Sequence, residues 1–333
     1  MPRTGSSGVT LLTGAGFTKT FGGYLGSEMW ARIFNQPEAQ QYPRIRRKML
    51  SDLNFESVYS HVVESPRYTP VEKHSFTVAI QNAYKSMHDY LLSEDMTLIR
   101  EATAACHSIV SRFAATNERP GFVFTLNQDL FIERWFEDVG QSVIIMPGIK
   151  PGPRWFNPGS GPWIDSTAHL PNKADVKKIM ETFYTKNDKR LIYLKLHGSY
   201  GWKRVGGPKI GDLMIIGKAK SKLIKREPVL RWYFRLFEEV LSRAKMLVVI
   251  GYGFGDKHIN KVILRNSRLM MSVICPLEPK VFKSNLLRQG AVGRKLWKKV
   301  ANYYQGDIRD LYYRDTRELT LDGQTYFSNL SAR

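Results

Sequence analysis

The feature that most constrains this chain is a set of four short apolar segments, each followed directly by glycines or polar residues. The segments cover residues 9–13, 121–125, 191–196 and 246–250. Continuous apolar runs of this length are typical of strands buried on both faces of a parallel sheet. Ligands of open parallel sheets bind beyond the carboxyl ends of the strands. The residues that follow the four segments are therefore predicted to meet at one edge of a sheet.

These following residues form four signatures. They read Gly-Ala-Gly-Phe-Thr at 14–18, Thr-Leu-Asn-Gln-Asp at 125–129, Leu-His-Gly-Ser at 196–199 and Gly-Tyr-Gly-Phe-Gly-Asp at 251–256. A glycine turn between a strand and a helix lets backbone N–H groups approach a phosphate, and the helix N-terminus adds partial positive charge. The first signature fits this pattern, although Gly-Ala-Gly is also a common strand-to-helix turn.

Structural roles could explain some of the same residues. Asn127 and Asp129 could form an Asx turn and a helix cap, and Asp256 could be an N-cap. His197 could be a core histidine that is hydrogen-bonded to the backbone. The case for a ligand site depends on all four signatures lying together.

Taken in order, GAGFT, TLNQD, LHGS and GYGFGDKHIN resemble the motifs of the sirtuin-like NAD-consuming domain, in the bacterial branch found in antiphage defence. The resemblance covers about residues 8–30 and 120–275. It implies a Rossmann-like fold, NAD as the substrate, and cleavage of NAD to nicotinamide and ADP-ribose. Related proteins are coupled to a HerA-type ATPase, a short Argonaute-type protein or a fused sensor domain. Because 333 residues leave little room for a sensor, we expect a homo-oligomer with a separate partner, a HerA-type ATPase or a short Argonaute-type protein.

The resemblance also implies a role for each matching residue. The implied catalytic residues are Asn127, His197 and Asp129. The implied cofactor-binding residues are Gly14, Ala15, Gly16, Phe17, Thr18, Gly198, Ser199, Gly251, Gly253 and Asp256. Deacylase sirtuins hold a structural zinc with two CxxC pairs, whereas this chain has only Cys106 and Cys275. That difference favours plain NAD cleavage, with no metal expected.

The charge of the chain leaves other functions open. The 333 residues carry a formal net charge of +20, with basic clusters at 44–48, 218–226 and 294–299. Such a charge attracts polyanions, so a nucleic-acid-binding or nuclease subunit is the main alternative. An ADP-ribosyltransferase or an NAD sensor would need the same pocket. No apolar run approaches the ~20 residues that cross a bilayer, which favours a cytoplasmic protein without membrane contact.

The rest of the sequence completes an α/β prediction with a mostly parallel, Rossmann-like sheet. Residues 1–34 and 116–333 are predicted to form the NAD-binding core, and residues 35–115 a helical insertion after the first strand. Residues 147–171 are expected to be a long loop. Trp202 and residues 213–216 are expected to form a small hairpin, residues 270–274 the last core strand, and residues 294–304 a basic helix.

Overall fold

The computed structural model describes residues 8–91, 96–113, 121–135, 143–151, 168–183, 190–204 and 213–309. Its centre is a seven-stranded sheet in the order β12-β11-β10-β1-β2-β6-β3, and every neighbouring pair is parallel. The strands are β1 (Val9–Thr13), β2 (Gly121–Thr125), β3 (Val143–Ile145), β6 (Arg190–Lys195), β10 (Met246–Ile250), β11 (Met270–Cys275) and β12 (Val300–Gln305). The predicted α/β fold with a Rossmann-like parallel sheet is confirmed.

The register of the central strands brings their carboxyl ends to one level. Thr13 pairs with Ile250 on one side and with Thr125 on the other, and Thr125 pairs with Lys195. Every residue of β1 and β2 is buried. The buried hydroxyl of Thr13 donates a hydrogen bond to that of Thr125 at 2.7 Å, so the polar atoms at this edge are paired. The four signatures thus begin side by side.

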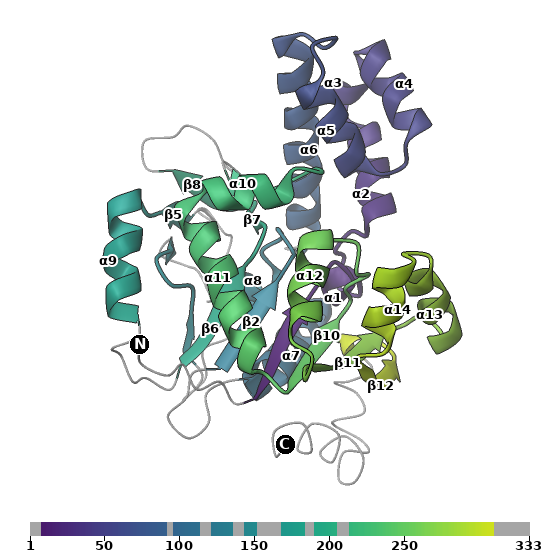
Figure 1. The fold of residues 1–333 in the computed structure, drawn as a ribbon. Coiled ribbons are helices and arrows are strands. Elements are labelled where there is room, and N and C mark those ends of the chain that lie inside the picture. The colour runs from purple at the N-terminus through teal and green to yellow at the C-terminus, as the bar shows by residue number, and fades with distance from the viewer. Residues whose placement is uncertain are drawn as a thin grey trace.

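Helices cover both faces of the sheet. In Figure 1, α11 (Pro228–Arg243) and α12 (Lys257–Arg265) lie in front of the strands and α7 (Met96–Val110) lies behind them. The buried residues of α11 recur at three- and four-residue steps, which is the spacing of one helix face. One contact of this face joins Phe237 to Phe124 of β2, with ring centroids 4.9 Å apart. Burial of such aromatic pairs holds the helix against the sheet.

Five helices between α1 (Gly16–Lys19) and α7, together called the helical block, stand at one end of the sheet, above it in Figure 1. They are α2 (Gly26–Phe34), α3 (Pro37–Gln40), α4 (Pro43–Ser51), α5 (Phe55–Glu64) and α6 (Pro70–Leu91). Prolines begin three of them, a position where the missing N–H has no intrahelical partner. Asn54 caps α5, because its side chain accepts a hydrogen bond from the Ser57 N–H. The described residues between 35 and 113 contain no strand, as predicted, and the exact domain boundaries stay a prediction.

The remaining elements are short or peripheral. The helices among them are α1 (Gly16–Lys19), the 3₁₀ turn η1 (Ser111–Phe113), α8 (Phe131–Trp135), α9 (Lys173–Phe183), α10 (Lys220–Arg226), α13 (Pro279–Leu287) and α14 (Ala291–Trp297). Two small sheets join β4 (Lys150–Pro151), β5 (Ala168–Leu170) and β8 (Trp202–Arg204), and β7 (Gly198–Ser199) with β9 (Leu213–Met214). Both cysteines are free. None of the described helices is long and apolar enough to cross a membrane.

Three expectations about local structure need correction. The predicted basic helix at 294–304 is wrong, since α14 ends at Trp297 and an edge strand, β12, follows. The Val-Ala-Asn-Tyr-Tyr-Gln sequence of β12 shows no clean alternation of buried residues, but valine and tyrosine favour strands. Trp202 does not pair with residues 213–214, because β8 pairs with β5 and β9 pairs with β7. Within the predicted loop 147–171, residues 150–151 form β4 and residues 168–170 form β5. Residues 152–167 lie outside the described residues.

Candidate active site

A pocket of about 450 Å³ lies where the four signatures meet, beyond the carboxyl ends of β1, β2, β6 and β10. Helices α2, α5 and α6 supply its opposite wall, so the helical block and the sheet both contribute to it. From the predicted site, the pocket is lined by Gly14, Ala15, Gly16, Asn127, Asp129, His197, Gly251, Gly253 and Asp256. The structure therefore brings together residues that are more than 200 positions apart in the chain.

The other predicted site residues do not line this pocket. Phe17 is fully buried and packs edge-on against Phe131 with ring centroids 5.9 Å apart. Gly198 has a φ of +75°, and a Cβ there would lie 1.9 Å from the Leu213 carbonyl oxygen. Ser199 is fully buried beside it. These residues support the walls of the site.

The glycine turn of the first signature packs closely on the fourth signature. Gly14 donates its N–H to the Ile250 carbonyl at 3.0 Å, and Gly16 donates to the Gly251 carbonyl at 2.9 Å. Gly251 has a φ of +65°, and a Cβ there would lie 2.2 Å from the Phe17 nitrogen. The N–H groups of Gly14 and Gly16 are thus already paired within the protein. In this structure these glycines allow two loops to touch, rather than offering those donors to a phosphate.

Asp129 forms an Asx turn as well as lining the pocket. Its Oδ1 accepts from the Phe131 N–H at 3.0 Å, at the start of α8, and its Oδ2 accepts from the Thr18 hydroxyl at 3.2 Å. Burial raises the pKa of Asp129, and the Lys195 ammonium opposes that rise. Both carboxylate oxygens are occupied, so Asp129 joins the first two signatures and fixes the loop that carries Asn127.

Asn127 is the half-buried member of this loop. Its backbone N–H donates to the Thr125 hydroxyl at 3.1 Å, which is the same hydroxyl that accepts from Thr13. This turn presents Asn127 to the pocket from the end of β2.

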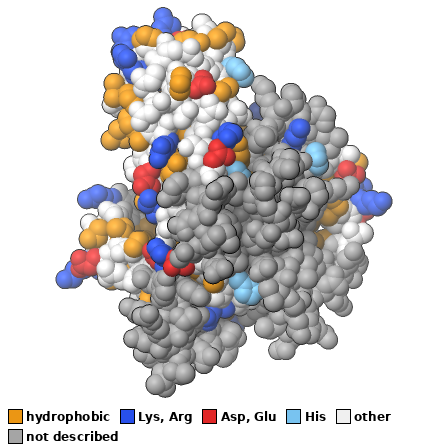
Figure 2. All heavy atoms as spheres, turned by 180° about the vertical axis from the view of Figure 1, so that it is seen from behind, with side chains coloured by type: hydrophobic (Ala, Val, Ile, Leu, Met, Phe, Trp, Pro, Cys, Tyr) orange, Lys and Arg blue, Asp and Glu red, His pale blue; other side chains and the backbone are white. Residues whose placement is uncertain are grey.

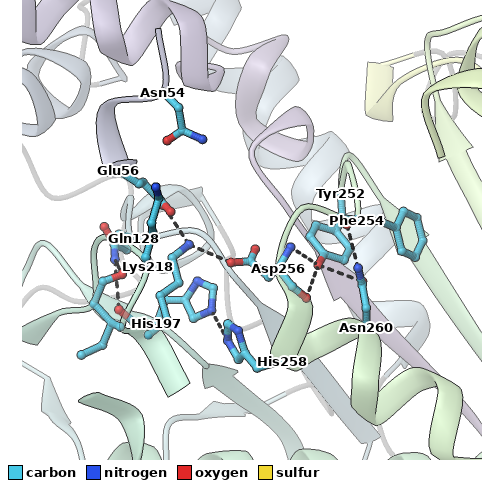
Figure 3. A network of polar contacts seen from close by, with 12 residues as sticks. Asn54, Glu56, Gln128, His197, Lys218, Tyr252, Phe254, Asp256, His258 and Asn260 are labelled. Atoms are coloured by element: carbon cyan, nitrogen blue, oxygen red, sulfur yellow. Dashed lines mark hydrogen bonds and ion pairs between the residues drawn. The ribbon is translucent and has the colours of Figure 1, made fainter. Parts of the chain in front are cut away.

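His197 lies at the end of β6 and is only 3% exposed. Its Nε2 is 2.9 Å from the Nε2 of His258, on α12 (Figure 3). Burial lowers the pKa of His197 to about 3, and the positive charge of Lys220 adds to this effect. The imidazole is therefore neutral at physiological pH, with a hydrogen bond to the backbone of Leu126. A neutral imidazole can accept a proton from a ligand, which is one requirement for a general base.

Gln128 positions the His197 backbone. Its Nε2 donates to the carbonyl of His197 at 3.1 Å and to that of Ile215 at 2.9 Å. Its Oε1 is buried and has no hydrogen-bond partner among the described residues. Because Gln128 also lines the pocket, it offers an acceptor to a ligand that carries an N–H or O–H.

Lys220 ties the helical block to the fourth signature. Its Nζ is 2.8 Å from Glu56 Oε1 on α5 and 2.8 Å from Asp256 Oδ1. Burial raises the pKa of Glu56. Burial also acts to raise the pKa of Asp256, but the neighbouring His197 and Lys220 outweigh it and the pKa is lowered. This ion triad borders the pocket and spans it from α5 to the turn after β10.

The turn after β10 is stabilised by Asn260, which belongs to the same GYGFGDKHIN motif as the turn. Asn260 Nδ2 donates to the carbonyl of Phe254 at 2.7 Å, and Phe254 has a φ of +56°, an uncommon value for a residue with a side chain. The Asp256 N–H donates to the Tyr252 hydroxyl at 3.0 Å. These bonds fix the turn that carries Asp256 (Figure 3).

Sequence reasoning missed four polar residues of this site. Gln128 and His258 belong to the quoted motifs TLNQD and GYGFGDKHIN, so their position was a usable signal. Glu56 and Lys220 carried no such signal, because Glu56 lies in the helical block and Lys220 belongs to a run of surface-like lysines.

Comparison with known proteins identifies the type of domain. Residues 121–276 match the family model of the SIR2-like domain. The chain thus contains a sirtuin-like domain over this range, which confirms the sirtuin-like part of the resemblance seen in the motifs. Domains of this family are typical of NAD-dependent enzymes. Three of the four signatures lie inside the matched range, while the first lies before it.

Searches of solved structures and of curated sequences give more distant results. A Sir2 homologue in complex with ADP-ribose aligns at 13% identity, Sir2Tm bound to a propionylated peptide at 11%, and Sir2 with a p53 peptide and NAD+ at 10%. In each case the TM-score is 0.39, and 94% of this chain and 94% of the other chain are covered. No curated protein matches the sequence.

Proposed function

We propose that this chain is an NAD+ nucleosidase, which hydrolyses the nicotinamide–ribose bond of NAD+ to give nicotinamide and ADP-ribose. One observation carries the proposal. Asn127 and the buried, neutral His197 line one pocket, at the carboxyl edge of a parallel sheet, with the glycine turns of the first and fourth signatures around them. The family match supports NAD+ as the substrate, because SIR2-like domains are typical of NAD-dependent enzymes.

The proposed chemistry needs few groups. Breaking the nicotinamide–ribose bond releases neutral nicotinamide and develops positive charge on the ribose, so the enzyme must hold the sugar and deliver water. Asn127 would orient the ribose and the water, and His197 would take the proton of the water. A weak base suffices, since water that attacks an oxocarbenium-like carbon becomes strongly acidic as the new bond forms. The Oε1 of Gln128, which has no hydrogen-bond partner in the described parts of the chain, suits a donor such as the carboxamide of nicotinamide.

The biological part of the proposal follows the motif resemblance. NAD+ depletion would halt an infected cell and so act in antiphage defence. An activity of this kind must be held off until infection, and we propose that a partner gates it, a HerA-type ATPase first and a short Argonaute-type protein second. A homo-oligomer in the cytoplasm is part of the same proposal.

An assay of NAD+ cleavage tests the enzymatic part. The chain would be incubated with NAD+ alone and with the product of the neighbouring gene, and nicotinamide and ADP-ribose would be separated by chromatography. Asn127→Ala and His197→Ala should each lower turnover by about 10²- to 10⁴-fold. Asn302→Ala, on the exposed edge strand β12, is a matched control that should keep full activity. If His197→Ala folds and retains full turnover, His197 is not the base.

Basic surface clusters favour nucleic-acid binding as a second candidate. Arg44, Arg46 and Arg47 on α4 are exposed, and Figure 2 shows Lys and Arg side chains gathered at the tip of the helical block. Lys220 does not belong to such a surface, because it is buried in the ion triad. Phosphate contacts should give DNA affinity that falls steeply with ionic strength. Absence of DNA binding at low salt would eliminate this candidate.

A further inference from the structure

One cluster at the wall of the pocket has a composition that the proposed reaction does not explain. His197, Asp256 and His258 each place one ligand-type atom within 4.8 Å of the other two. His197 and Asp256 line the pocket, which gives an entry path from solvent. His258 comes from the other side, on α12, and its ring lies 5.7 Å from that of Phe234. NAD+ hydrolysis, as proposed above, needs only one of these two imidazoles.

Two imidazoles and one carboxylate are a donor set that suits zinc and its neighbours in the first transition series. Three protein ligands leave a coordination position free, and here it would face the pocket. Two nitrogens bound to one tetrahedral zinc, each at about 2.0–2.1 Å, lie roughly 3.3 Å apart. The Nε2 atoms of His197 and His258 are 2.9 Å apart in a hydrogen bond, so both rings must turn toward a common point, and the two nitrogens separate by a few tenths of an ångström, to admit the ion.

The surroundings of the cluster also fit a metal. Histidine must be neutral to bind a metal, and burial lowers the pKa of both His197 and His258. The hydrogen bond from His197 to the Leu126 backbone orients the ring, as second-shell partners of metal ligands do. The hydrogen bond between the two rings would be lost.

The charged groups that face the cluster set its affinity. Lys220 lies 2.8 Å from Asp256 and competes with a cation for that carboxylate, whereas Glu56 lies 2.8 Å from Lys220 and offsets its charge. Two carboxylates against one ammonium leave the group net negative before a metal arrives. These opposing charges point to reversible rather than permanent binding.

We propose that His197, His258 and Asp256 form a binding site for a divalent transition metal, for which zinc is the test ion, and that the bound metal inhibits the enzyme. The inhibitory part rests on the proposed function, since the Nε2 of His197 cannot ligate a metal and accept a proton at the same time. The binding part is independent of any activity.

Zinc binding would be measured on the chain without a histidine tag, by competition with a chromogenic zinc indicator. We expect one zinc per chain with a dissociation constant below about 10 µM, weakened at least tenfold in His258→Gln and in Asp256→Asn. His74→Gln, on α6 away from the pocket, and Cys275→Ser are matched controls that should bind as the unaltered chain does. Circular dichroism would show that each variant is folded. No zinc binding, or equal binding in His258→Gln and its controls, would overturn the proposal.

Cobalt(II) tests the site without any substitution. Visible absorption of the cobalt-loaded chain should show the bands of a low-coordinate nitrogen and oxygen site and lack the intense charge-transfer band of a thiolate ligand. A thiolate band would place the metal on Cys106 or Cys275 instead, and would overturn the assignment.

Measuring NAD+ cleavage in the presence of zinc distinguishes the proposed metal site from the proposed NAD+ nucleosidase function. Zinc should inhibit NAD+ cleavage over the concentration range in which it binds, and a chelator should restore the rate. Cleavage that continues at saturating zinc would overturn the inhibitory role and leave the proposed function standing. A chain that binds zinc through the three residues but cleaves no NAD+ with or without its partner would overturn the proposed function and the inhibitory role, and would support the site itself.

Discussion

Replacing His197 by glutamine should remove a specific loss of stability in acid. In the folded chain burial lowers the pKa of His197 to about 3, whereas an unfolded histidine has a pKa of about 6.5. Between these values the unfolded state binds a proton that the folded state does not, so the free energy of unfolding falls as the pH falls through 6.5. At pH 5.0 this difference amounts to about 2 kcal/mol, at about 1.4 kcal/mol for each pH unit below 6.5.

Urea unfolding at pH 7.5 and pH 5.0 measures this effect. The original chain should lose about 2 kcal/mol more than His197→Gln over that interval, because all other groups titrate in both proteins. The pKa of His258 is also lowered by burial and its ring contacts that of His197, so the comparison is repeated with His258→Gln in both proteins, where the same difference of about 2 kcal/mol is expected. Asn302→Ala, at an exposed position on β12 that does not titrate, is the matched control and should lose as much as the original chain. Equal losses in the original chain and His197→Gln would refute the claim that His197 is buried and neutral.

The remaining predictions concern the packing of the turns and the ion triad. Gly251→Ala should lower the free energy of unfolding by about 2–5 kcal/mol, since its Cβ would meet the Phe17 nitrogen at 2.2 Å in a left-handed conformation. Gly253→Ala, where a Cβ would have nothing within 4 Å, should cost less than about 1 kcal/mol, and equal costs in urea unfolding would contradict the packing. Lys220→Met should cost about 2–4 kcal/mol by leaving two carboxylates unpaired, and adding Glu56→Gln should recover part of that loss. If the double variant is no more stable than Lys220→Met, the triad does not hold the helical block to the sheet.

The sheet and its ligand-binding edge could be predicted because buried parallel strands have a recognisable local sequence pattern. Each of β1, β2, β6 and β10 is a short apolar run, and the rule that ligands bind at the carboxyl ends needs no knowledge of strand order. The expectation that Asn127, His197 and Gly251 meet in space follows from these two facts alone. Strand β12 lacks this pattern, because an edge strand is largely exposed and its buried and exposed residues need not alternate.

The polar contacts inside the site could not be predicted in the same way. In the sequence Lys220 is one of several neighbouring lysines that look exposed. Only the fold brings Glu56 of α5 close enough to form an ion pair with it. The pairing of His197 with His258 likewise depends on how α12 lies against the end of β6. The glycine turn could not be interpreted correctly from sequence either. Its sequence is typical of a phosphate-binding turn, but the Gly16 N–H donates a hydrogen bond to the Gly251 carbonyl. Contacts between elements distant in sequence decide what such residues do.

The most direct test of the central claim is NAD+ cleavage by the unaltered chain and by Asn127→Ala, each measured alone and with the product of the neighbouring gene. The account predicts that nicotinamide and ADP-ribose form in equal amounts in at least one of the two conditions with the unaltered chain. It also predicts that Asn127→Ala, folded to the same extent, lowers that rate by about 10²-fold or more. Intact NAD+ after prolonged incubation in both conditions, or full turnover by Asn127→Ala, would contradict it.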